Sequence, residues 1–519
     1  MKRIGIDVGG TNTDAVILER SRVVAAVKVP TSADVSTGIA RALRELLASV
    51  PDIGDRAGGV EAVVIGTTHF TNAIVERRDL APVAAVRIGL PASASLPPFC
   101  DWPDDLAALA RGAVYMLEGG HEYDGRPIAP FDASGMQRVA RDIHARGLRS
   151  VGIASVFSPL TDECERAAAE ILHETCPGVD VTLSRDLSRI GLLERENATL
   201  LNACLIGLAR QTTRAFRAAI EASGISAPLF LTQNDGTVMR AEFAEAFPVF
   251  SFASGPTNSM RGAAFLSGLS DAMVIDVGGT TTDIGRLVRG FPAEANTVVL
   301  IGGVRTLFRM PDLLSVALGG GSIVDPSTGA FQGRSVGHRI TEEALVFGGT
   351  RVTATDVAVA AGRADIGDRD RVRALEPWLV QACLAGARDL FETSVDRMKT
   401  DARQIPLVAV GGAAFLVPDR LPGISDVVTV PNGAVANAIG AAIAQVSGEV
   451  DQIFSGCDRD TAIDRATELA RARAVEAGAD SESLIITDVD DLPLAYLPGD
   501  ARRVRVRVVG DTRPSERER

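Results

Sequence analysis

Short apolar runs alternate with segments of helical spacing along the first half of the chain. Runs rich in valine, isoleucine and alanine at 60–66, 82–88 and 150–157 predict buried strands. Positions 161–172 predict a helix that begins after an N-cap threonine. Strands that alternate with helices in this way are typical of parallel βαβ construction, so the pattern predicts an α/β fold.

Longer helical patterns follow. Apolar positions recur at helical spacing from Leu192 to Ala222, which predicts one long helix that ends at Gly224. An alanine-rich segment at 432–446 predicts a second helix. The remainder, from about 448 to 519, predicts a small appendage of one helix and two strands, with frayed final residues. Its predicted elements cover positions 459–477, 484–489 and 504–509, and the fraying is expected over 511–519.

A nine-residue pattern occurs twice in the chain. Ile6–Asp14 (IDVGGTNTD) returns as Ile275–Asp283 (IDVGGTTTD), with eight of the nine positions identical and an offset of 269 residues. Aliphatic residues flank each copy, so each copy predicts a strand, a tight glycine turn and a second strand. The repeat predicts two related α/β units. Two ordinary hairpins are the alternative, although a plain turn does not need Thr-x-Thr-Asp after its glycines.

The residues of this turn suit a polyphosphate. Paired glycines let the main chain approach a ligand and turn N–H groups toward an anion. Threonine hydroxyls add donors, and an aspartate at the end of each first strand can hold Mg²⁺. We expect Asp14 and Asp283 to act either at the site or as structural turn caps. The predicted metal ligands are Asp7 and Asp276, and the predicted phosphate contacts are Gly9, Gly10, Thr11, Asn12, Thr13, Gly278, Gly279, Thr280, Thr281 and Thr282.

Two later glycine clusters are weaker candidates for the same ligand. Gly319–Gly321 precedes Ser322, and Gly411-Gly412 follows a buried strand at 406–410, where a flat adenine and ribose could be admitted. Of these we single out Gly320, Gly411 and Gly412 as nucleotide contacts, with simple loops as the alternative. The chain contains neither a GK[ST] phosphate loop nor GxGxxG, which excludes both of those nucleotide-binding motifs.

Composition narrows the classes of function. The formal net charge of −13 argues against a nucleic-acid partner and against an anionic membrane surface. The six cysteines form no CxxC pair, so we expect reduced, inert thiols. A charged residue at position 7 interrupts the N-terminal apolar run, and the longest apolar stretch, 405–418, is too short to span a bilayer. These features predict a cytoplasmic protein without a membrane segment.

The chain resembles the hydantoinase/oxoprolinase family, and more specifically its hydantoinase A-like subunits. The resemblance rests on both hairpins and on a set of further motifs in the same order. These are Gly66–Ala73 (GTTHFTNA), Glu194-Arg195 with Asn202-Ala203, Ser254–Pro256, Gly319–Ile323 and Gly411-Gly412.

The resemblance implies an actin/sugar-kinase/Hsp70 (ASKHA) fold, with two ribonuclease-H-like lobes and ATP between them. It implies an N-terminal lobe over 1–190, a linking helix with the second lobe over 191–447, and the small α+β appendage over 448–519. It also implies ATP- and Mg²⁺-dependent hydrolysis of a cyclic amide such as a hydantoin, 5-oxoproline or a related lactam, through phosphorylation of the carbonyl oxygen.

The family pattern also suggests which residues face the substrate and which partners to expect. The implied substrate-side residues are Thr67, Thr68, Asn72, Glu194 and Arg195, with a buried ion pair as the alternative for the last two. A separate hydantoinase-type subunit and an oligomeric assembly are expected as well. An ASKHA-type small-molecule kinase and an ATP-driven chaperone or reactivating factor remain the alternative functions.

Two segments depart from the usual family sequence. The run after Gly321-Ser322, which commonly reads like Pro-Gly-Pro-Ala-Cys-Tyr-Gly, is replaced by Ser335–Glu343. The usual Ser-Asn-Gly-Gly is replaced by Thr232–Thr237. Both changes predict a divergent branch with its own substrate.

Overall fold

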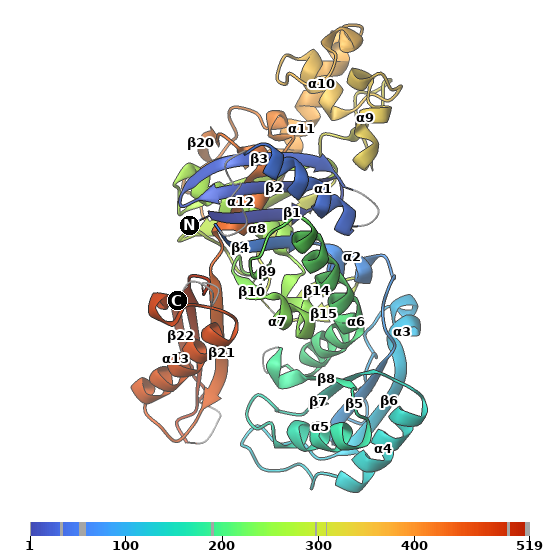
Figure 1. The fold of residues 1–519 in the computed structure, drawn as a ribbon, viewed down its shortest axis with the longest axis vertical. Helices are drawn as coiled ribbons and strands as arrows, with labels where there is room; N and C mark the ends of the chain where they lie inside the picture. Colours follow the sequence, from blue (N-terminus) through green and yellow to red (C-terminus); the bar gives the residue numbers. More distant parts are fainter. Residues whose placement is uncertain are drawn as a thin grey trace.

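The computed structural model describes residues 2–31, 35–50, 59–187, 191–295, 298–307, 309–495 and 499–513 (Figure 1). The first lobe is built on three antiparallel strands, and the first copy of the sequence repeat joins the first two of them. β1 pairs with β2, β2 pairs with β3, and β4 and β9 then run parallel to β1. The bounds are β1 (Lys2–Val8), β2 (Asn12–Glu19), β3 (Arg22–Pro30), β4 (Val60–Thr67) and β9 (Leu229–Thr232).

The second lobe repeats this arrangement. β11 and β12 form the second hairpin, β13 extends it antiparallel, and β19 and β20 run parallel to β11. The bounds are β11 (Ala272–Val277), β12 (Thr282–Val288), β13 (Phe291–Pro292), β16 (Leu313–Val316), β19 (Ile405–Val410) and β20 (Ile424–Thr429). The same strand pairing in both lobes confirms the two related α/β units that the sequence repeat predicts.

Two helices pack tightly between the lobes. α8 (Ser254–Ser267) and α12 (Ala436–Ile443) approach each other through glycines. A Cβ on Gly262 would lie 1.9 Å from the carbonyl oxygen of Ala436, and one on Gly440 would lie 1.8 Å from that of Asn258. Only hydrogen fits at these two positions. The helix expected over 432–446 is shorter in the structure. α12 ends at Ile443, and a strand starts at Val446.

A separate four-stranded parallel sheet is inserted after β4, at the lower right of Figure 1. Its order is β6-β5-β7-β8, and the long helix α6 (Leu192–Ala222) packs on β7 and returns the chain to the first lobe. The helix expected from Thr161 begins instead at Glu163, after Asp162. The bounds are β5 (Val83–Leu90), β6 (Arg111–Glu118), β7 (Ser150–Ser155), β8 (Asp180–Leu183), α3 (Asp104–Ala110), α4 (Ala133–Ala145) and α5 (Glu163–Thr175).

The C-terminal segment continues the first sheet. β21 (Val446–Phe454) pairs with β10 (Val238–Arg240), and β23 (Arg502–Gly510) and β22 (Ile485–Pro493) complete a sheet of order β22-β23-β21-β10-β9-β4-β1-β2-β3. α13 (Arg459–Glu476) covers it with an alanine stripe. Strand pairing thus crosses the boundaries expected at residues 190 and 447.

The structure describes only part of the C-terminal segment that we expect to be frayed. Arg513 N donates to the carbonyl of Gly478 at 2.8 Å, which ties down residues 511–513, while 514–519 lie outside the described residues. Within the described part of the chain, no helix has the length and hydropathy that spanning a membrane requires. The remaining elements are α1 (Val35–Ala48), α2 (His69–Val75), α7 (Ala241–Ala246), β14 (Val299–Ile301), β15 (Val304–Thr306), β17 (Ser322–Val324), β18 (Phe331–Ser335), α9 (Ile340–Glu343), α10 (Ala354–Ala360) and α11 (Pro377–Met398).

Candidate functional site

The first hairpin presents an open glycine turn. Gly9 N donates to the carbonyl of Asn12 at 3.0 Å, and Thr31 supports the turn from β3 because its hydroxyl donates to the carbonyl of Gly9 at 2.7 Å. Gly10 is exposed, and a Cβ there would meet no atom within 4 Å. Thr11 and Asn12 are half-buried, whereas Thr13 is buried and its hydroxyl lies 3.4 Å from that of Thr31.

The second hairpin has the same construction. Gly278 N donates to the carbonyl of Thr281 at 2.9 Å, and Thr280 and Thr281 are exposed at its tip. Thr282 is buried like Thr13, and its hydroxyl donates to the carbonyl of Leu318 at 2.6 Å. In both copies, therefore, the last threonine makes a hydrogen bond within the protein while the tip stays open.

The two turns, one from each lobe, meet. A Cβ on Gly279 would come 3.1 Å from the hydroxyl oxygen of Thr11. The charges behind the turns also interact, since the charge of Asp276 contributes to the raised pKa of Asp7. The structure therefore brings the two copies of the repeat to one place.

Asp7 lies in a buried polar pocket. Asn437 Nδ2 from α12 donates to Asp7 Oδ2 at 2.9 Å, and Asn258 Nδ2 from α8 lies 3.4 Å from Oδ1. Burial above all, and then the nearby charge of Asp14, raise the pKa of Asp7 to about 7, although hydrogen bonds from the two asparagine amides lower it. A carboxyl held in this state gains from a cation beside it.

Asp14 and Asp283 occupy equivalent positions in the two hairpins but have different partners. Lys28 Nζ lies 2.6 Å from Asp14 Oδ1, and Asn437 also donates to Asp14 at 2.9 Å. Asp283 accepts a hydrogen bond from the Ser315 hydroxyl, and burial raises its pKa to about 6. These contacts favour the structural alternative for Asp14, because its carboxylate already has a cation partner.

Burial also raises the pKa of Asp276, while a hydrogen bond from Ser259 and the charge of Lys28 lower it. Asp276 is partly exposed. Gly411 lies against it, because a Cβ there would come 2.3 Å from Asp276 Oδ1, and its φ of +92° also favours glycine.

The glycine run at 319–321 borders the second turn. Gly320 N and Gly321 N donate to the carbonyls of Gly278 and Gly279 at 3.0 and 2.7 Å, so these two amides are used within the protein. Gly412 is exposed, and a Cβ there would meet no atom within 4 Å. Of the two weaker clusters, Gly411-Gly412 leaves more open space beside the predicted metal carboxylate.

Thr67 and Thr68 lie where β4 ends, beside the end of β1. Thr67 is buried, and its main chain exchanges hydrogen bonds with the Ser254 hydroxyl, at 3.2 Å from N and 2.9 Å from O. Thr68 is half-buried, and exposed Asn72 donates to its hydroxyl at 3.3 Å. Since Asp7 pairs with Gly66 in the sheet, these residues stand one strand away from the first carboxylate.

Glu194 and Arg195 lie at the start of α6 and point to different surroundings. Arg305 donates to Glu194 at 3.1 Å. Arg195 is fully buried, and it donates to the Ser184 hydroxyl at 2.8 Å and to the carbonyl of Ser155 at 2.5 Å. The structure thus places Arg195 in the core of the inserted sheet, where burial lowers its pKa to about 10. Its contact with substrate stays a prediction.

The donor set fits magnesium better than a metal with many protein ligands. Among the described residues, no group of three or more His, Cys, Asp or Glu side chains could hold a metal ion. Mg²⁺ is commonly bound through one or two carboxylates, with phosphate and water oxygens as its other ligands. The pair Asp7 and Asp276, each with a raised pKa, suits this mode of binding.

Two family models match consecutive parts of the chain. The hydantoinase/oxoprolinase N-terminal region matches residues 3–176, and hydantoinase/oxoprolinase matches residues 195–367, which together make about two thirds of the chain. The chain belongs to the hydantoinase/oxoprolinase family. Membership of this family accounts for the two hairpin motifs and for their order along the chain.

Named relatives differ in what they act on. The chain is 25% identical over 393 residues to the acetophenone carboxylase gamma subunit of Aromatoleum aromaticum, a match that covers 69% of this chain and 53% of that protein. It is 24% identical over 401 residues to the caprolactamase subunit alpha of Pseudomonas jessenii, which covers 69% and 54%. The chain therefore spans about half the length of these curated relatives.

A solved structure supports the fold. The crystal structure of the ATP-dependent caprolactamase from Pseudomonas jessenii matches with a TM-score of 0.75 at 17% identity, over 98% of this chain and 87% of that one. At this identity the likeness shows the fold alone. The two-lobed α/β architecture that the resemblance implies is thereby confirmed.

Sequence reasoning missed the residues that hold the carboxylates. Asn258, Asn437 and Lys28 all contact or neutralise Asp7 or Asp14. The two asparagines are 251 and 430 positions away from Asp7. The sequence contains one indication of such a role, because Asn437 is the single polar residue in the alanine-rich segment of α12, ANAIGAAI.

Proposed function

We propose that this chain is an ATP-dependent hydrolase that opens a cyclic amide by phosphoryl activation of its carbonyl. The observation that carries the proposal is the meeting of two equivalent glycine turns, Gly279 against Thr11, in front of two carboxylates with raised pKa values. The hydantoinase/oxoprolinase family and its caprolactamase relative support the choice of a cyclic amide.

The open tips of the hairpins are the proposed phosphate contacts. Main-chain N–H groups of Gly10, Thr11, Thr280 and Thr281 lie at surfaces that remain accessible, which suits a triphosphate. Thr13 and Thr282 then support the turns from behind. Gly320, Gly411 and Gly412 are the proposed neighbours of the nucleoside.

Asp7 and Asp276 are the proposed carboxylate ligands of Mg²⁺. When bound there, Mg²⁺ supplies positive charge that neutralises the phosphate oxygens during phosphoryl transfer. Asn258 and Asn437 orient Asp7 for this task through their amide groups.

The reaction that we propose has three steps. The carbonyl oxygen of the cyclic amide attacks the γ-phosphorus of ATP, and ADP leaves. Water then adds to the activated carbon and the C–N bond breaks, which gives a free amine and an acyl phosphate. A second water cleaves the acyl phosphate, and inorganic phosphate and the ring-opened carboxylate are released. Activation is required because an amide is a poor electrophile and its nitrogen is a poor leaving group.

Thr67, Thr68, Asn72 and Glu194 are the proposed substrate-side residues. Thr68 and Asn72 hold each other at 3.3 Å beside the end of β1, so they can present a hydroxyl and an amide to the substrate. Arg195 is proposed to act indirectly, by fixing Ser184 and the start of α6. A second hydantoinase-type subunit is proposed as a partner, since both named relatives are themselves subunits.

The test is an assay with ATP, Mg²⁺ and a panel of hydantoins, lactams, 5-oxoproline and sugars. We expect ADP together with a ring-opened product, and no sugar phosphate. Asp276→Ala is expected to abolish ATP turnover without unfolding the protein. A sugar phosphate, ATP loss without ring opening, or normal turnover in Asp276→Ala would contradict the proposal. Copurification of an unrelated chain tests the partner.

A further inference from the structure

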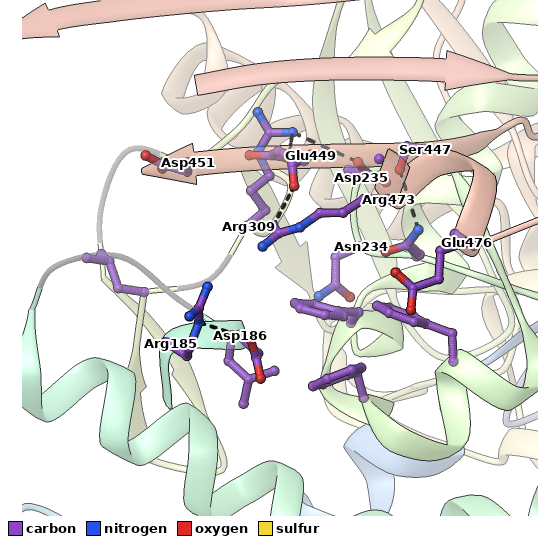
Figure 2. Close-up of a pocket in the computed structure, with 18 residues that line it drawn as sticks. Arg185, Asp186, Asn234, Asp235, Arg309, Ser447, Glu449, Asp451, Arg473 and Glu476 are labelled. Atoms are coloured by element: carbon purple, nitrogen blue, oxygen red, sulfur yellow. Dashed lines mark hydrogen bonds and ion pairs between the residues drawn. The ribbon is translucent and has the colours of Figure 1, made fainter. Parts of the chain in front are cut away.

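A cavity of about 480 Å³ lies beside β21 of the nine-stranded sheet, and none of the hairpin residues lines it. Five parts of the chain form its walls. These are α7 with the 3-10 helix at Pro248–Ser251, the 3-10 helix at Ser184–Asp186 with Leu187, the turn at 233–235 between β9 and β10, Leu307 with Arg309, and the C-terminal elements β21 and α13 (Figure 2). Its volume is in the range of small-molecule sites.

One wall is aromatic. Phe243, Phe247 and Phe250 are all half-buried and border the cavity, with ring centroids 4.9 Å apart for Phe243 and Phe247 and 5.8 Å apart for Phe247 and Phe250. Aromatic residues make up only 4% of this chain, so three rings around one cavity are a marked concentration. Such a wall suits the apolar body of a ligand.

Much of the charge around the cavity is already paired. Arg309 lies 2.5 Å from a carboxylate oxygen of Glu449. Asp451 accepts a hydrogen bond from Arg503 Nε at 2.6 Å. These four residues therefore present little net charge to a ligand, and the charges that remain available decide which ligand fits.

Arg473 and Glu476 supply the available charges, one turn apart on α13. Among the described residues, neither has an oppositely charged side-chain atom within 4.0 Å, and Arg473 donates only to the main-chain carbonyl of Glu449 at 2.7 Å. Figure 2 shows Arg473 directed toward Arg185 and Asp186, with Glu476 on the other side of the cavity. One cavity thus offers a cation and an anion at separate places beside an apolar wall.

We propose that this cavity binds a free amino acid. Arg473 holds the carboxylate through its guanidinium, Glu476 holds the ammonium, and the carbon chain lies against Phe247 and its neighbours. Binding at this place requires neither ATP nor the hairpins. If the proposed function holds and the cyclic amide is a lactam, the ring-opened product belongs to this same chemical class, and the cavity is then a site for product.

Calorimetric titration of the whole chain with four matched probes tests the chemistry. The probes are norleucine and 6-aminohexanoate, which carry both charges, and hexanoate and hexylamine, which carry one charge each. We expect at least one of the doubly charged probes to bind ten-fold more tightly than either singly charged one. Equal binding of hexanoate or hexylamine, or no binding of either amino acid, would overturn the proposal.

Substitutions locate the site. Arg473→Gln and Glu476→Gln are each expected to weaken binding by ten-fold or more, whereas Arg471→Gln and Glu468→Gln, on the same helix but not lining the cavity, leave it unchanged. An unchanged affinity in both cavity variants would refute the assignment. Asp276→Ala separates the two proposals, because we expect it to lose ATP turnover and to keep amino-acid binding. Loss of binding in folded Asp276→Ala would show that the site is not independent of the hairpins.

Discussion

Gly279 lies against Thr11, and this contact joins the hairpin turns of the two lobes. A Cβ at residue 279 would come 3.1 Å from the Thr11 hydroxyl oxygen and 3.2 Å from its methyl carbon. The absence of a side chain in one turn therefore allows the other turn to approach. In the proposed function, this approach lets both sets of main-chain N–H groups reach one triphosphate.

Enlarging residue 279 is expected to separate the turns. Gly279→Val places branched carbons where Thr11 lies, so we expect kcat/KM for ATP to fall at least ten-fold, with a melting temperature close to that of the wild type. Steady-state ATP turnover and thermal unfolding measure the two effects. Turnover at the wild-type level would show that the turns do not need this contact.

A substitution at Gly10, in the first hairpin turn, tests the proposed phosphate site. Because a Cβ at residue 10 meets no protein atom within 4 Å, Gly10→Ala is expected to leave the free energy of unfolding nearly unchanged. The added methyl occupies space assigned to phosphate, so we expect the Kd for ATP to rise about ten-fold. Gly207→Ala, which also adds a Cβ in open space but lies in α6, is the matched control and should bind ATP normally.

The raised pKa of Asp7 predicts that this carboxyl lowers the free energy of unfolding in a pH-dependent way. The ordinary value is 3.8, and burial raises it to about 7. Between these values the folded protein holds a proton that the unfolded chain has lost, so this carboxyl destabilises the fold as the pH rises through the window. Below about pH 4 it has no such effect, and above about pH 7 the penalty is complete, at most about 4 kcal/mol.

Asp7→Asn is expected to remove this cost. In metal-free buffer, the free energy of unfolding of Asp7→Asn minus that of the wild type should therefore increase from pH 4 to pH 8. Urea unfolding at a series of pH values measures it. Added Mg²⁺ and ATP should reduce the difference at pH 8, because a bound cation favours the charged carboxylate. Parallel stability curves for the two proteins would exclude a raised pKa at Asp7.

Local sequence was sufficient for the hairpins and insufficient for their surroundings. The turns at Gly9 and Gly278 follow from glycines and neighbouring residues, so a nine-residue pattern predicts them. The amides that hold Asp7 come from Asn258 and Asn437, on helices distant in sequence, and no periodicity specifies such contacts. Likewise, nothing in the apolar pattern of Val446–Phe454 reveals that this strand joins the first sheet through β10.

Asn437 is expected to tune the affinity for metal. Its Nδ2 donates to Asp7 and to Asp14 at 2.9 Å, and both hydrogen bonds favour the charged carboxylates. In Asn437→Ala we expect the pKa of Asp7 to rise further and the Mg²⁺ concentration for half-maximal ATP turnover to increase three- to ten-fold at pH 7. The difference should shrink at pH 9, where Asp7 is ionised in both proteins. A loss of equal size at both pH values would indicate a purely structural effect.

Gly440 links the stability of the protein to its site. A Cβ at residue 440 would lie 1.8 Å from the carbonyl oxygen of Asn258, which is main chain and can move only if α8 moves. Gly440→Ala is therefore expected to cost about 3 kcal/mol or more. Because Asn258 and Asn437 sit on the two helices that this contact joins, displacement also removes amides from Asp7, and ATP turnover should fall in whatever protein remains folded.

Gly386→Ala is the matched control for this substitution. Gly386 lies within α11, and a Cβ there meets no atom within 4 Å, so the exchange should stabilise the helix by about 0.5–1 kcal/mol. Urea unfolding and ATP turnover of both variants distinguish the contact from a general response to alanine. If Gly440→Ala were as stable as Gly386→Ala, α8 and α12 could not be packed as closely as this structure has them, and the amide support of Asp7 would have to arise in another way.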